Sequence, residues 1–420
     1  MNFCTKTLIY CAFPTALVTA TPAAAADIDL LSPETVEISG DLRFVAGDGE
    51  ESWTEGGFGK TRYGSITHPV PGNADLVWQP RIGWSLSATV VGSFVGGPRA
   101  EAGLSQAFFS LRPPAKTGFR WSVRAGLMWP PVSLEHEGPD WHVADTVTPS
   151  AINSWIGEEV RPAAVETTVD ARVGSGRLVA TAALFAANDT AGTLLALRGW
   201  ALHDRKTLAF RRQPLPELNE DMEYVQPRFT HPLLDIEPGF AVRPGFYGRL
   251  AWETGLPLRI ELFGYDNRGD PEAYNDDMEW GWRTRFVQLA AVARPAKSTE
   301  IKLQAMTGHS LMGYVEADGR RWVDHRFRAA YLLVSHDWDK LSLTSRAEWF
   351  DGRQRGSFVD DEDDEDGWAL TTCGQWRISP SFDALVEFLH VRSRREARER
   401  DDDAATQHEN QLQAVLRARW

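Results

Sequence analysis

Hydrophobic and polar residues alternate along many stretches of the chain. In the stretch 246–253, Phe, Gly, Leu and Trp fall on one face, and Tyr, Arg, Ala and Glu fall on the other. After Gly255 the chain returns through 258–265 with the same alternation. Successive side chains of a β-strand point to opposite faces of its sheet. The two stretches therefore predict a β-hairpin with one apolar face and one charged face.

The same alternation recurs in 119–127, in 341–349 and in 411–420, which ends at Trp420. The predicted strand segments as a whole are about 10–14 residues long, nearer to the ~9–11 residues that cross a bilayer at a tilt than to the ~5–6 typical of soluble sheets. Their apolar faces mix Gly and Ala with aromatic residues. A soluble β-sandwich also alternates, but its packed core favours bulky aliphatic residues. The pattern favours a membrane barrel, closed by a final strand that ends at Trp420.

Connections of two lengths separate the predicted strands. Short links lie at 379–381, 337–340, 295–298 and 255–257, and longer polar connections lie at 395–408, 353–366, 315–323 and 268–280. Outer-membrane barrels alternate short periplasmic turns with long outer loops in this way. We therefore predict an all-β fold, a transmembrane antiparallel β-barrel of 16–18 strands with long outer loops.

The strand count depends on the N-terminal half of the chain. Two long connections, 130–164 and 214–245, must both be external for the rhythm to hold. Eighteen strands result if 193–213 forms a hairpin about 203–206 and if a weak extra strand lies near 58–66. Without these two choices there are sixteen strands, and an even number is expected in either case.

The first 26 residues have the layout of a secretory signal peptide. Lys6 gives a basic start, 8–18 is largely apolar, and three alanines at 24–26 offer a cleavage site before Asp27. We therefore divide the chain into a signal peptide, 1–26, and an outer-membrane β-barrel, 27–420, with an infolded loop around 130–164. The expected location is the outer membrane of a Gram-negative cell.

Composition narrows the class of protein further. No run of about 18 or more apolar residues follows the signal, so the sequence offers no transmembrane helix. The 17 Trp and 20 Phe agree with a membrane interface, where aromatic residues concentrate. The net charge of −14 argues against nucleic acid as a partner. Only Cys373 remains after the signal, so the mature chain has no intrachain disulfide.

No stretch of the chain carries a convincing catalytic or metal-binding motif. The acidic run 360–366 lacks the ligand spacing of a calcium loop and is interpreted as a solvated outer loop. The stretch 308–313 is close to a nucleophile elbow but has one residue too many before its second glycine. The ten His residues show no metal-ligand spacing. We predict no catalytic residue, no metal site and no cofactor.

Arginines on the polar faces of the strands are the candidate pore-lining residues. The set consists of Arg120, Arg124, Arg249, Arg259, Arg346 and Arg417. One interpretation is a charged, water-filled lumen that sorts solutes by size and charge. The other is that the arginines pair across strands with Glu253, Glu261 and Glu348 and hold the wall together. We expect water in the lumen rather than a packed plug.

One passage resembles a known family. Gly126 to Glu135 ends a predicted strand with two prolines, and Thr148 to Arg161 and Glu166 follow. This passage is similar to the strand-to-loop segment of porin-like outer-membrane proteins related to the phosphate-selective porin O and P family. The stretch 40–43 is similar to that family's opening strand. The resemblance covers about 40 residues and implies a homotrimer of barrels, each with an infolded constriction loop. It does not carry phosphate selectivity across.

Within this loop, five residues are the candidates for the constriction. They are Glu135, Trp155, Glu158, Glu159 and Arg161, with a short helix over 150–159. We expect the charged residues among them to face Arg120 and Arg124 across the lumen; the alternative is a structural latch over the barrel mouth.

The predicted function is an outer-membrane porin that allows passive diffusion of small hydrophilic solutes. The alternatives are a non-conducting structural barrel, an outer-membrane barrel enzyme, and a soluble periplasmic β-protein. The expected partners are outer-membrane lipid, lipopolysaccharide and the solutes themselves.

Overall fold

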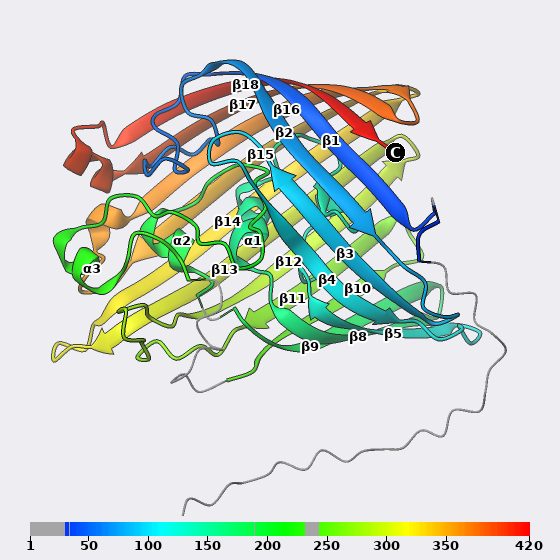
Figure 1. Cartoon of the computed structure of the whole chain (residues 1–420), viewed down its shortest axis with the longest axis horizontal. Helices are drawn as coiled ribbons and strands as arrows, with labels where there is room; N and C mark the ends of the chain where they lie inside the picture. The colour runs from blue at the N-terminus through cyan, green and yellow to red at the C-terminus, as the bar shows by residue number, and fades with distance from the viewer. Residues whose placement is uncertain (1–29, 33, 189, 232–242) are drawn as a thin grey trace, which may run out of the picture.

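The computed structural model describes residues 30–32, 34–188, 190–231 and 243–420, so the predicted signal peptide lies outside the described residues. In this part of the chain, sixteen antiparallel strands close into one barrel, in which each strand pairs with its neighbours in chain order and β1 pairs with β18 (Figure 1). The strands are β1 Val36–Gly47, β2 Thr67–Trp78, β3 Leu86–Val95, β4 Glu101–Leu111, β5 Phe119–Leu127, β8 Ala163–Val173, β9 Gly176–Ala186, β10 Gly245–Glu253, β11 Leu258–Asp266, β12 Arg283–Ala296, β13 Thr299–Val315, β14 Arg321–Trp338, β15 Leu341–Gln354, β16 Glu365–Ser379, β17 Phe382–Arg395 and β18 Thr406–Arg419.

Alternation in the sequence becomes alternation between the two sides of this wall. On β10 and β11, Leu250 lies opposite Leu262, and both side chains point outward. The next pair, Arg249 and Phe263, points into the lumen. The last strand closes the barrel as predicted: Trp420 exchanges backbone hydrogen bonds of 2.9 Å with Ile38. The prediction of a closed antiparallel barrel is confirmed, with sixteen strands among the described residues.

The two ends of the barrel differ in the length of their connections. One end, which we call the short-turn end, carries the turns at 174–175, 254–257, 297–298, 339–340 and 380–381 together with the links at 79–85 and 112–118. The opposite, long-loop end carries the connections 48–66, 96–100, 128–162, 187–244, 267–282, 316–320, 355–364 and 396–405. The C-terminus lies at the short-turn end (Figure 1). In outer-membrane barrels the short turns are periplasmic.

The two choices that would have raised the count to eighteen strands are wrong. The segment 58–66 makes only isolated bridges, and 193–213 begins with helix α2, Thr193–Leu197, and contains no strand in the range that the structure describes. The described part of 187–244 contains no strand between β9 and β10, so both long connections lie at the same end with sixteen strands in the described chain. The apolar residues of 193–202 are buried inside the barrel, and they therefore do not form a lipid-facing strand.

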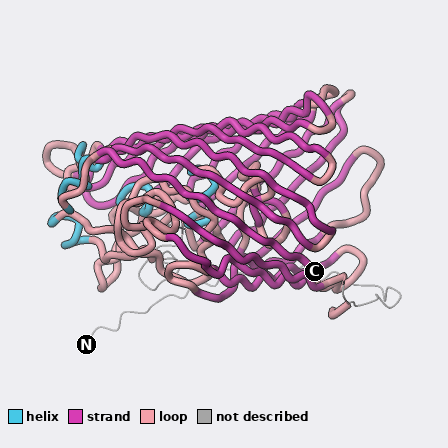
Figure 2. Tube along the Cα trace, turned by 90° about the horizontal axis from the view of Figure 1, so that it is seen from above, coloured by secondary structure: helices cyan, strands magenta, loops and turns pink. Residues whose placement is uncertain are grey.

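Three of the long connections turn into the barrel. The connection 128–162 contains the hairpin of β6, His136–Glu137, and β7, His142–Val143, and then helix α1, Ala151–Glu159. Both α1 and α2 lie within the ring of strands, whereas α3, Glu220–Val225, lies at the long-loop end (Figures 1 and 2). Short 3-10 helices, η2 at Asp361–Asp363 and η3 at Glu396–Asp401, occur in two other connections at that end. None of the described helices is long and apolar enough to span a membrane.

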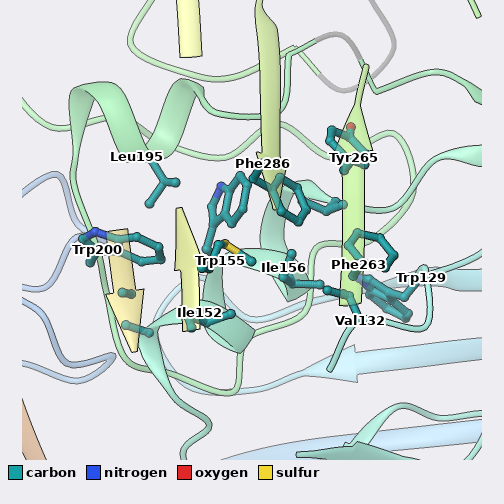
Figure 3. Close-up of a cluster of buried hydrophobic side chains, with 14 of the residues drawn as sticks. Trp129, Val132, Ile152, Trp155, Ile156, Leu195, Trp200, Phe263, Tyr265 and Phe286 are labelled. Carbon is teal, nitrogen blue, oxygen red and sulfur yellow. The ribbon is translucent and has the colours of Figure 1, made fainter. Parts of the chain in front are cut away.

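The main hydrophobic cluster of the molecule lies inside the lumen. Trp155 of α1 packs edge-on against Trp200, Phe286 and Phe327, with ring centroids 5.3–6.3 Å apart (Figure 3). The phenylalanines come from the inward faces of β12 and β14. Edge-to-face contacts at these distances are favourable beyond the burial of area alone. The infolded segments are therefore packed against the wall as a core and are not merely suspended in it.

The outward face of the barrel carries an apolar band, with exposed aromatic residues near the short-turn end. Seven large aromatic side chains are exposed near the short-turn end: Trp84, Phe119, Trp121, Trp338, Trp376, Phe382 and Trp420. Between the two ends, the outward positions are mainly Leu and Val, as on β18, where Leu412 and Leu416 are exposed. An apolar band bordered by aromatic residues is the surface that a transmembrane barrel presents to lipid.

Candidate functional site in the barrel lumen

The loop 128–162, which we call the infolded loop, leaves the wall at a sharp bend. Gly126 has φ of +140°, and a Cβ at this position would lie 2.2 Å from the carbonyl oxygen of Ala107, so glycine is required here. Pro130 and Pro131 then carry the chain away from β5. Helix α1 begins after Ser150, whose hydroxyl accepts a hydrogen bond from the backbone N–H of Asn153 at 3.4 Å.

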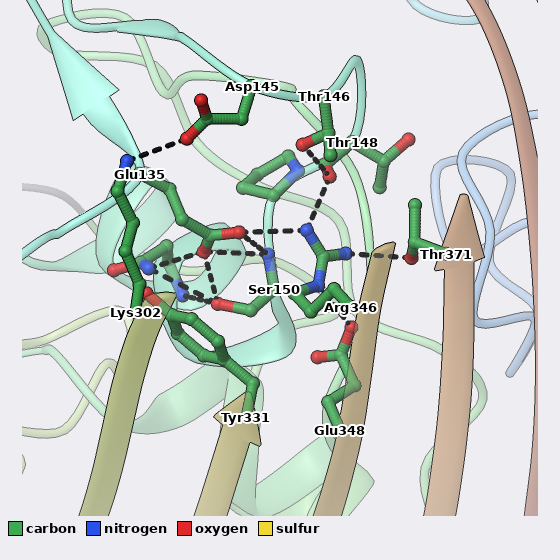
Figure 4. A network of polar contacts seen from close by, with 12 residues as sticks. Glu135, Asp145, Thr146, Thr148, Ser150, Lys302, Tyr331, Arg346, Glu348 and Thr371 are labelled. Atoms are coloured by element: carbon green, nitrogen blue, oxygen red, sulfur yellow. Dashed lines mark hydrogen bonds and ion pairs between the residues drawn. The ribbon is translucent and has the colours of Figure 1, made fainter. Parts of the chain in front are cut away.

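A buried polar network holds the start of this helix against the wall. The carboxylate of Glu135 accepts hydrogen bonds from the backbone N–H and the hydroxyl of Ser150, at 3.0 and 2.5 Å (Figure 4). It also pairs with Arg346 of β15 at 2.8 Å. The Arg346 guanidinium pairs in turn with Glu348 at 2.8 Å and donates to the carbonyl of Thr148 at 2.9 Å. Arg346 therefore joins the loop to the barrel wall.

The other end of α1 is joined to the second infolded segment, the part of 187–231 around α2. Glu158 pairs with Arg198 at 2.8 Å and lies 3.2 Å from His203. Burial opposes ionisation of this carboxyl, but the Arg198 and His203 side chains overcome that effect and lower the pKa of Glu158 to about 2. Glu158 is therefore a fixed negative charge whose partners lie on the neighbouring loop.

Glu159 performs a different task at the same junction. Its carboxylate accepts hydrogen bonds from the backbone N–H groups of Gly192 and Leu194, at 2.9 and 3.0 Å, and from the indole of Trp155 at 2.7 Å. These backbone groups belong to the N-terminal turn of α2, where a carboxylate is a favourable cap. Its partial burial nevertheless raises the pKa of Glu159 to about 7.

The connection 48–66 supplies a third segment inside the barrel. Glu409 of β18 accepts hydrogen bonds from the backbone N–H groups of Lys60 and Thr61, at 2.7 and 3.0 Å. The amine of Lys60 pairs with Glu365 at 2.5 Å, and its burial lowers its pKa to about 8. Arg62 pairs with Asp204 of the second segment at 2.7 Å. The three segments are therefore linked to the wall and to one another by buried charges.

One side of the inner wall carries an excess of arginine. We call the inward faces of β5 and β8–β11 the arginine wall, and its basic residues are Arg120, Arg124, Arg172, Arg177, Arg249 and Arg259. Its acidic residues are Glu166, Asp170, Glu253 and Glu261. Six basic against four acidic groups leave a surplus of positive charge on this side of the lumen.

Most members of the arginine wall are paired with a neighbour on the wall. Arg124 pairs with Glu166 at 2.8 Å, and the carboxylate of Glu261 pairs with both Arg249 and Arg259. Arg177 pairs with Asp170 and Glu253. Arg120 and Arg172 are exposed toward the short-turn end and make no ion pair among the residues that the structure describes. The surplus charge is thus concentrated at this mouth of the barrel.

Three cavities follow the arginine wall from one end of the barrel to the other. At the short-turn end, a cavity of about 630 Å³ is lined by residues that include Arg120, Arg172 and Arg177. Further in, a cavity of about 240 Å³ is bordered by Arg124, Arg249 and Trp129. At the long-loop end, a cavity of about 50 Å³ is bordered by residues that include Glu158, Glu159 and Arg161.

Arg161 stands between the second and third of these cavities. Its guanidinium lies over the ring of Trp129, 5.2 Å from the ring centroid, and donates to the carbonyl of Thr207. Burial lowers the pKa of Arg161 to about 9, because Glu101, the one acidic residue acting on it, only partly offsets the loss of water. Arg161, which borders the third cavity, is therefore in contact with Trp129, which borders the second.

The predicted pore-lining arginines separate into two groups. Arg120, Arg124, Arg249 and Arg259 lie together on the arginine wall, and the first three border the cavities described above. Arg346 is completely buried on the opposite side and fastens the infolded loop. Arg417 donates to the carbonyl of Val143 at 3.2 Å and borders a cavity of about 50 Å³ beside β1.

The partners expected for the constriction loop are wrong. Glu135 faces Arg346 and Glu158 faces Arg198, whereas the partner of Arg124 is Glu166 of the neighbouring strand. Trp155 is buried in the hydrophobic cluster and lines no solute path. These partners are separated by 211 and 40 positions along the chain, and no local spacing reveals them. Of the five predicted loop residues, Arg161 is the one that separates two cavities.

The expectation of water rather than a packed plug needs a correction. The three infolded segments occupy the centre of the lumen, and α1 is buried along almost its whole length. Water is therefore confined to cavities beside them. Sequence reasoning missed Trp129, Arg172 and Arg177 as lining residues. The alternation of residues could have identified Arg172 and Arg177, because both continue the inward faces of β8 and β9.

The described residues give little support for a catalytic site or a metal site. His309 and Ser310 are adjacent but point to opposite sides of the wall: His309 pairs with Asp324, and Ser310 hydrogen-bonds to Thr284 in the interior. They cannot act together as a nucleophile and its base. No group of three or more His, Cys, Asp or Glu side chains in the described part of the chain is arranged to hold a metal ion.

Comparison with solved structures shows which proteins have a similar fold. No protein-family model matches the chain, and no curated protein matches its sequence. The anion-selective porin from Comamonas acidovorans matches the fold with 10% identity, over 92% of this chain and 99% of that chain, with a TM-score of 0.53. The outer-membrane channel DcaP of Acinetobacter baumannii matches with 9% identity, over 96% and 99%, with a TM-score of 0.54. The chain has the fold of an outer-membrane porin.

A trimer form of OmpT, an outer-membrane protein of Vibrio cholerae, is a weaker match, with 10% identity, coverage of 92% and 99%, and a TM-score of 0.47. At identities of 9–10% the likeness concerns the fold alone. It supports a porin-like barrel and does not reach the phosphate-selective porin O and P family.

Proposed function

We propose that this protein is an exported outer-membrane porin through which small hydrophilic solutes diffuse passively. The observation that carries the proposal is the series of three cavities beside the arginine wall, inside a closed sixteen-stranded barrel with an infolded loop. The path runs along one wall because the centre of the lumen is packed. Arg124, Arg249 and Trp129 border its middle section, and Arg161 stands between that section and the cavity at the long-loop end.

The charge of the path favours small anions. Arg120 and Arg172 are unpaired among the described residues and line the largest of the three cavities along the arginine wall. Two acidic residues there, Asp170 and Glu253, are already paired with Arg177. A mouth with a surplus of charges of one sign raises the local concentration of solutes of the opposite sign. The paired arginines deeper in the path supply donors for a passing anion without binding it tightly, as conduction requires.

Single-channel recording tests the proposal directly. The purified full-length protein in a planar bilayer is expected to give discrete conductance steps and, in a KCl gradient, a reversal potential that reports anion preference. Replacing both Arg120 and Arg172 by Glu is expected to reverse the sign of that preference. The control is Arg377→Glu, which makes the same replacement at a single position at the short-turn end on β16, away from the three cavities. It is expected to leave the reversal potential near the wild-type value.

The packed lumen also supports a second candidate function, a barrel that does not conduct. Large aromatic residues and buried ion pairs fill the centre, as expected of an interior built for stability. The same recordings decide between the two functions. An absence of conductance steps from protein that shows heat-modifiable migration on a gel would favour the structural barrel.

The remaining features follow from the porin proposal. Residues 1–26 would act as the signal peptide, and outer-membrane lipid and lipopolysaccharide would surround the apolar band. A homotrimer related to the phosphate-selective porin O and P family is part of the proposal. Its support is the bend at Gly126 and the infolded loop that follows. Mass measurement of the detergent-solubilised protein tests the trimer.

A further inference from the structure

The outward face of the wall has a trough where two glycines meet. Gly248 of β10 lies directly opposite Gly264 of β11, and the large side chains of Leu250 and Leu262 are opposite each other one outward position further along. A Cβ added at Gly264 would meet no atom within 4 Å, and one added at Gly248 would meet only a carbonyl oxygen at 3.7 Å. The absent side chains therefore leave open space on a surface that is elsewhere covered by leucine and valine.

This trough is part of a larger groove. Its volume is about 660 Å³, within the range of ~300–1,000 Å³ found for small-molecule sites. Phe246 and Val287 form apolar sides, each about half exposed, and Thr307 of β13 continues the floor. Because these residues lie on the outward faces of β10 to β13, the groove opens toward lipid and not toward the lumen. It has the shape and lining to accept a hydrocarbon chain.

The end of the groove nearer the long loops is charged. Asp266, Arg285 and His309 are in register on three neighbouring strands and all border the groove. Asp266 lies 3.4 Å from Arg283, and His309 lies 2.6 Å from Asp324, so both carboxylates at this end have partners.

Arg285 is exposed and makes no ion pair among the described residues. Arg326 is the next outward residue in register after His309, and it lies 3.9 Å from Asp324. Three arginines therefore stand against two aspartates at the head of an apolar groove, in a chain whose net charge is −14.

We propose that this groove binds lipopolysaccharide from the outer leaflet, with one acyl chain in the glycine trough and a phosphate of the lipid A moiety against Arg285. The amphiphile is anionic at one end and apolar along its length, which matches the groove's charge and lining. The long-loop end of an outer-membrane barrel faces the outer leaflet, where this lipid is found. Binding at this outward site does not require that the lumen conducts.

The test measures binding of purified lipid A to the full-length protein in detergent by native mass spectrometry. The wild-type chain is expected to hold one lipid A. Gly264→Leu fills the trough without meeting another atom at Cβ and is expected to weaken binding at least tenfold. Arg285→Gln is expected to weaken it about tenfold, which corresponds to about 1.4 kcal/mol. Lipid A without phosphates is expected to bind to wild type about as weakly as lipid A binds to Arg285→Gln.

Gly374→Leu is the matched control. It lies on β16, and a Cβ there also meets no atom within 4 Å, so the substitution is equivalent but remote from the groove. It is expected to leave binding within twofold of wild type. Equal binding by the Gly264→Leu and Gly374→Leu chains would overturn the proposal. So would equally tight binding of phosphatidylglycerol, or a disulfide between two Val287→Cys chains that shows a second copy of the protein covering the groove.

Discussion

Removal of the Arg346 guanidinium should loosen the infolded loop within an intact barrel. In the Arg346→Leu variant, Glu135 and Glu348 lose the ion pairs at 2.8 Å that they share with this arginine. Both carboxylates stay buried, and the carbonyl of Thr148 loses a hydrogen bond of 2.9 Å. The leucine side chain fills part of the same space but has no hydrogen-bond donor.

The size of the effect follows from which contacts join the loop to the wall. Removing one member of a buried ion pair costs roughly 3–5 kcal/mol, because the remaining charge is left without a partner. Two of the lost contacts, to Glu135 and to Thr148, hold the loop, whereas the contact to Glu348 lies within the wall. Hydrogen bonds to charged groups contribute about 1.5–3 kcal/mol. We take about 2 kcal/mol, a value within this last range, as the share of the loss that acts on the loop. A free-energy change of that size corresponds to a roughly 30-fold larger population in which the loop is displaced.

Hydrogen exchange of the α1 amides, followed by mass spectrometry, measures this population. We expect the helix peptide of Arg346→Leu to exchange roughly 30-fold faster than in wild type, and we expect single-channel current to become noisier. Arg377→Leu is the control, because its ion pair with Asp337 at 3.1 Å joins side chains that are about half exposed. Such surface pairs contribute about 0–1 kcal/mol. The control should therefore change α1 exchange by less than about fivefold.

Two results would refute this reasoning. One is α1 exchange at the wild-type rate in an Arg346→Leu chain that still forms a heat-modifiable barrel. The other concerns the double variant Glu135→Leu with Arg346→Leu. If the unpaired carboxylate of Glu135 is the cause, the double variant should be less perturbed than the sum of the two single variants, because that one of the two stranded charges is gone. Simple additivity would show that the two groups do not act through each other.

Three further outcomes are expected. Because burial raises the folded-state pKa of Glu159 to about 7, this group's contribution to stability is fully present below about pH 4.5, and roughly 3 kcal/mol is lost as the pH rises through 7. The melting temperature of Glu159→Gln should therefore fall less than that of wild type between pH 5 and pH 8, and equal falls would contradict the assignment. Arg161→Ala opens the contact between two cavities and should raise single-channel conductance; an unchanged conductance would contradict the proposed path. Gly126→Ala should lower the yield of folded barrel on refolding, as judged by heat-modifiable migration, whereas Gly374→Ala should not.

The barrel wall could be predicted from the sequence because a two-sided wall between lipid and lumen imposes a period of two. The stretches around Leu250 and Leu262 show that period, and the short turns between strands set the direction of each one. The strand count was harder to predict. Residues 193–202 are mostly apolar, which suits a lipid-facing strand. In the structure they are apolar because they are buried inside the barrel.

Aromatic residues at inward strand positions indicate a packed lumen, but the arginines on the same faces favoured the interpretation of a water-filled one. Phe286, Phe327 and Phe350 occupy inward positions of β12, β14 and β15, where a lumen full of water would carry polar residues. The pairing of charges gave no such signal. Glu135 and Arg346 are 211 positions apart, and the partner of each depends on where the infolded loop lies in space. Spacing along the chain cannot supply that information.

The hydrogen bonds from Lys60 and Thr61 to Glu409 have a consequence for the order of assembly. They join parts of the chain about 350 positions apart, and Glu409 belongs to β18, which follows the other fifteen strands of the barrel in chain order. Contacts of such long separation form late, because the whole intervening chain must first be ordered. The first loop can therefore reach its final place only after the barrel has closed. A chain truncated before Glu409 would lack both the closing strand and the acceptor that seats this loop.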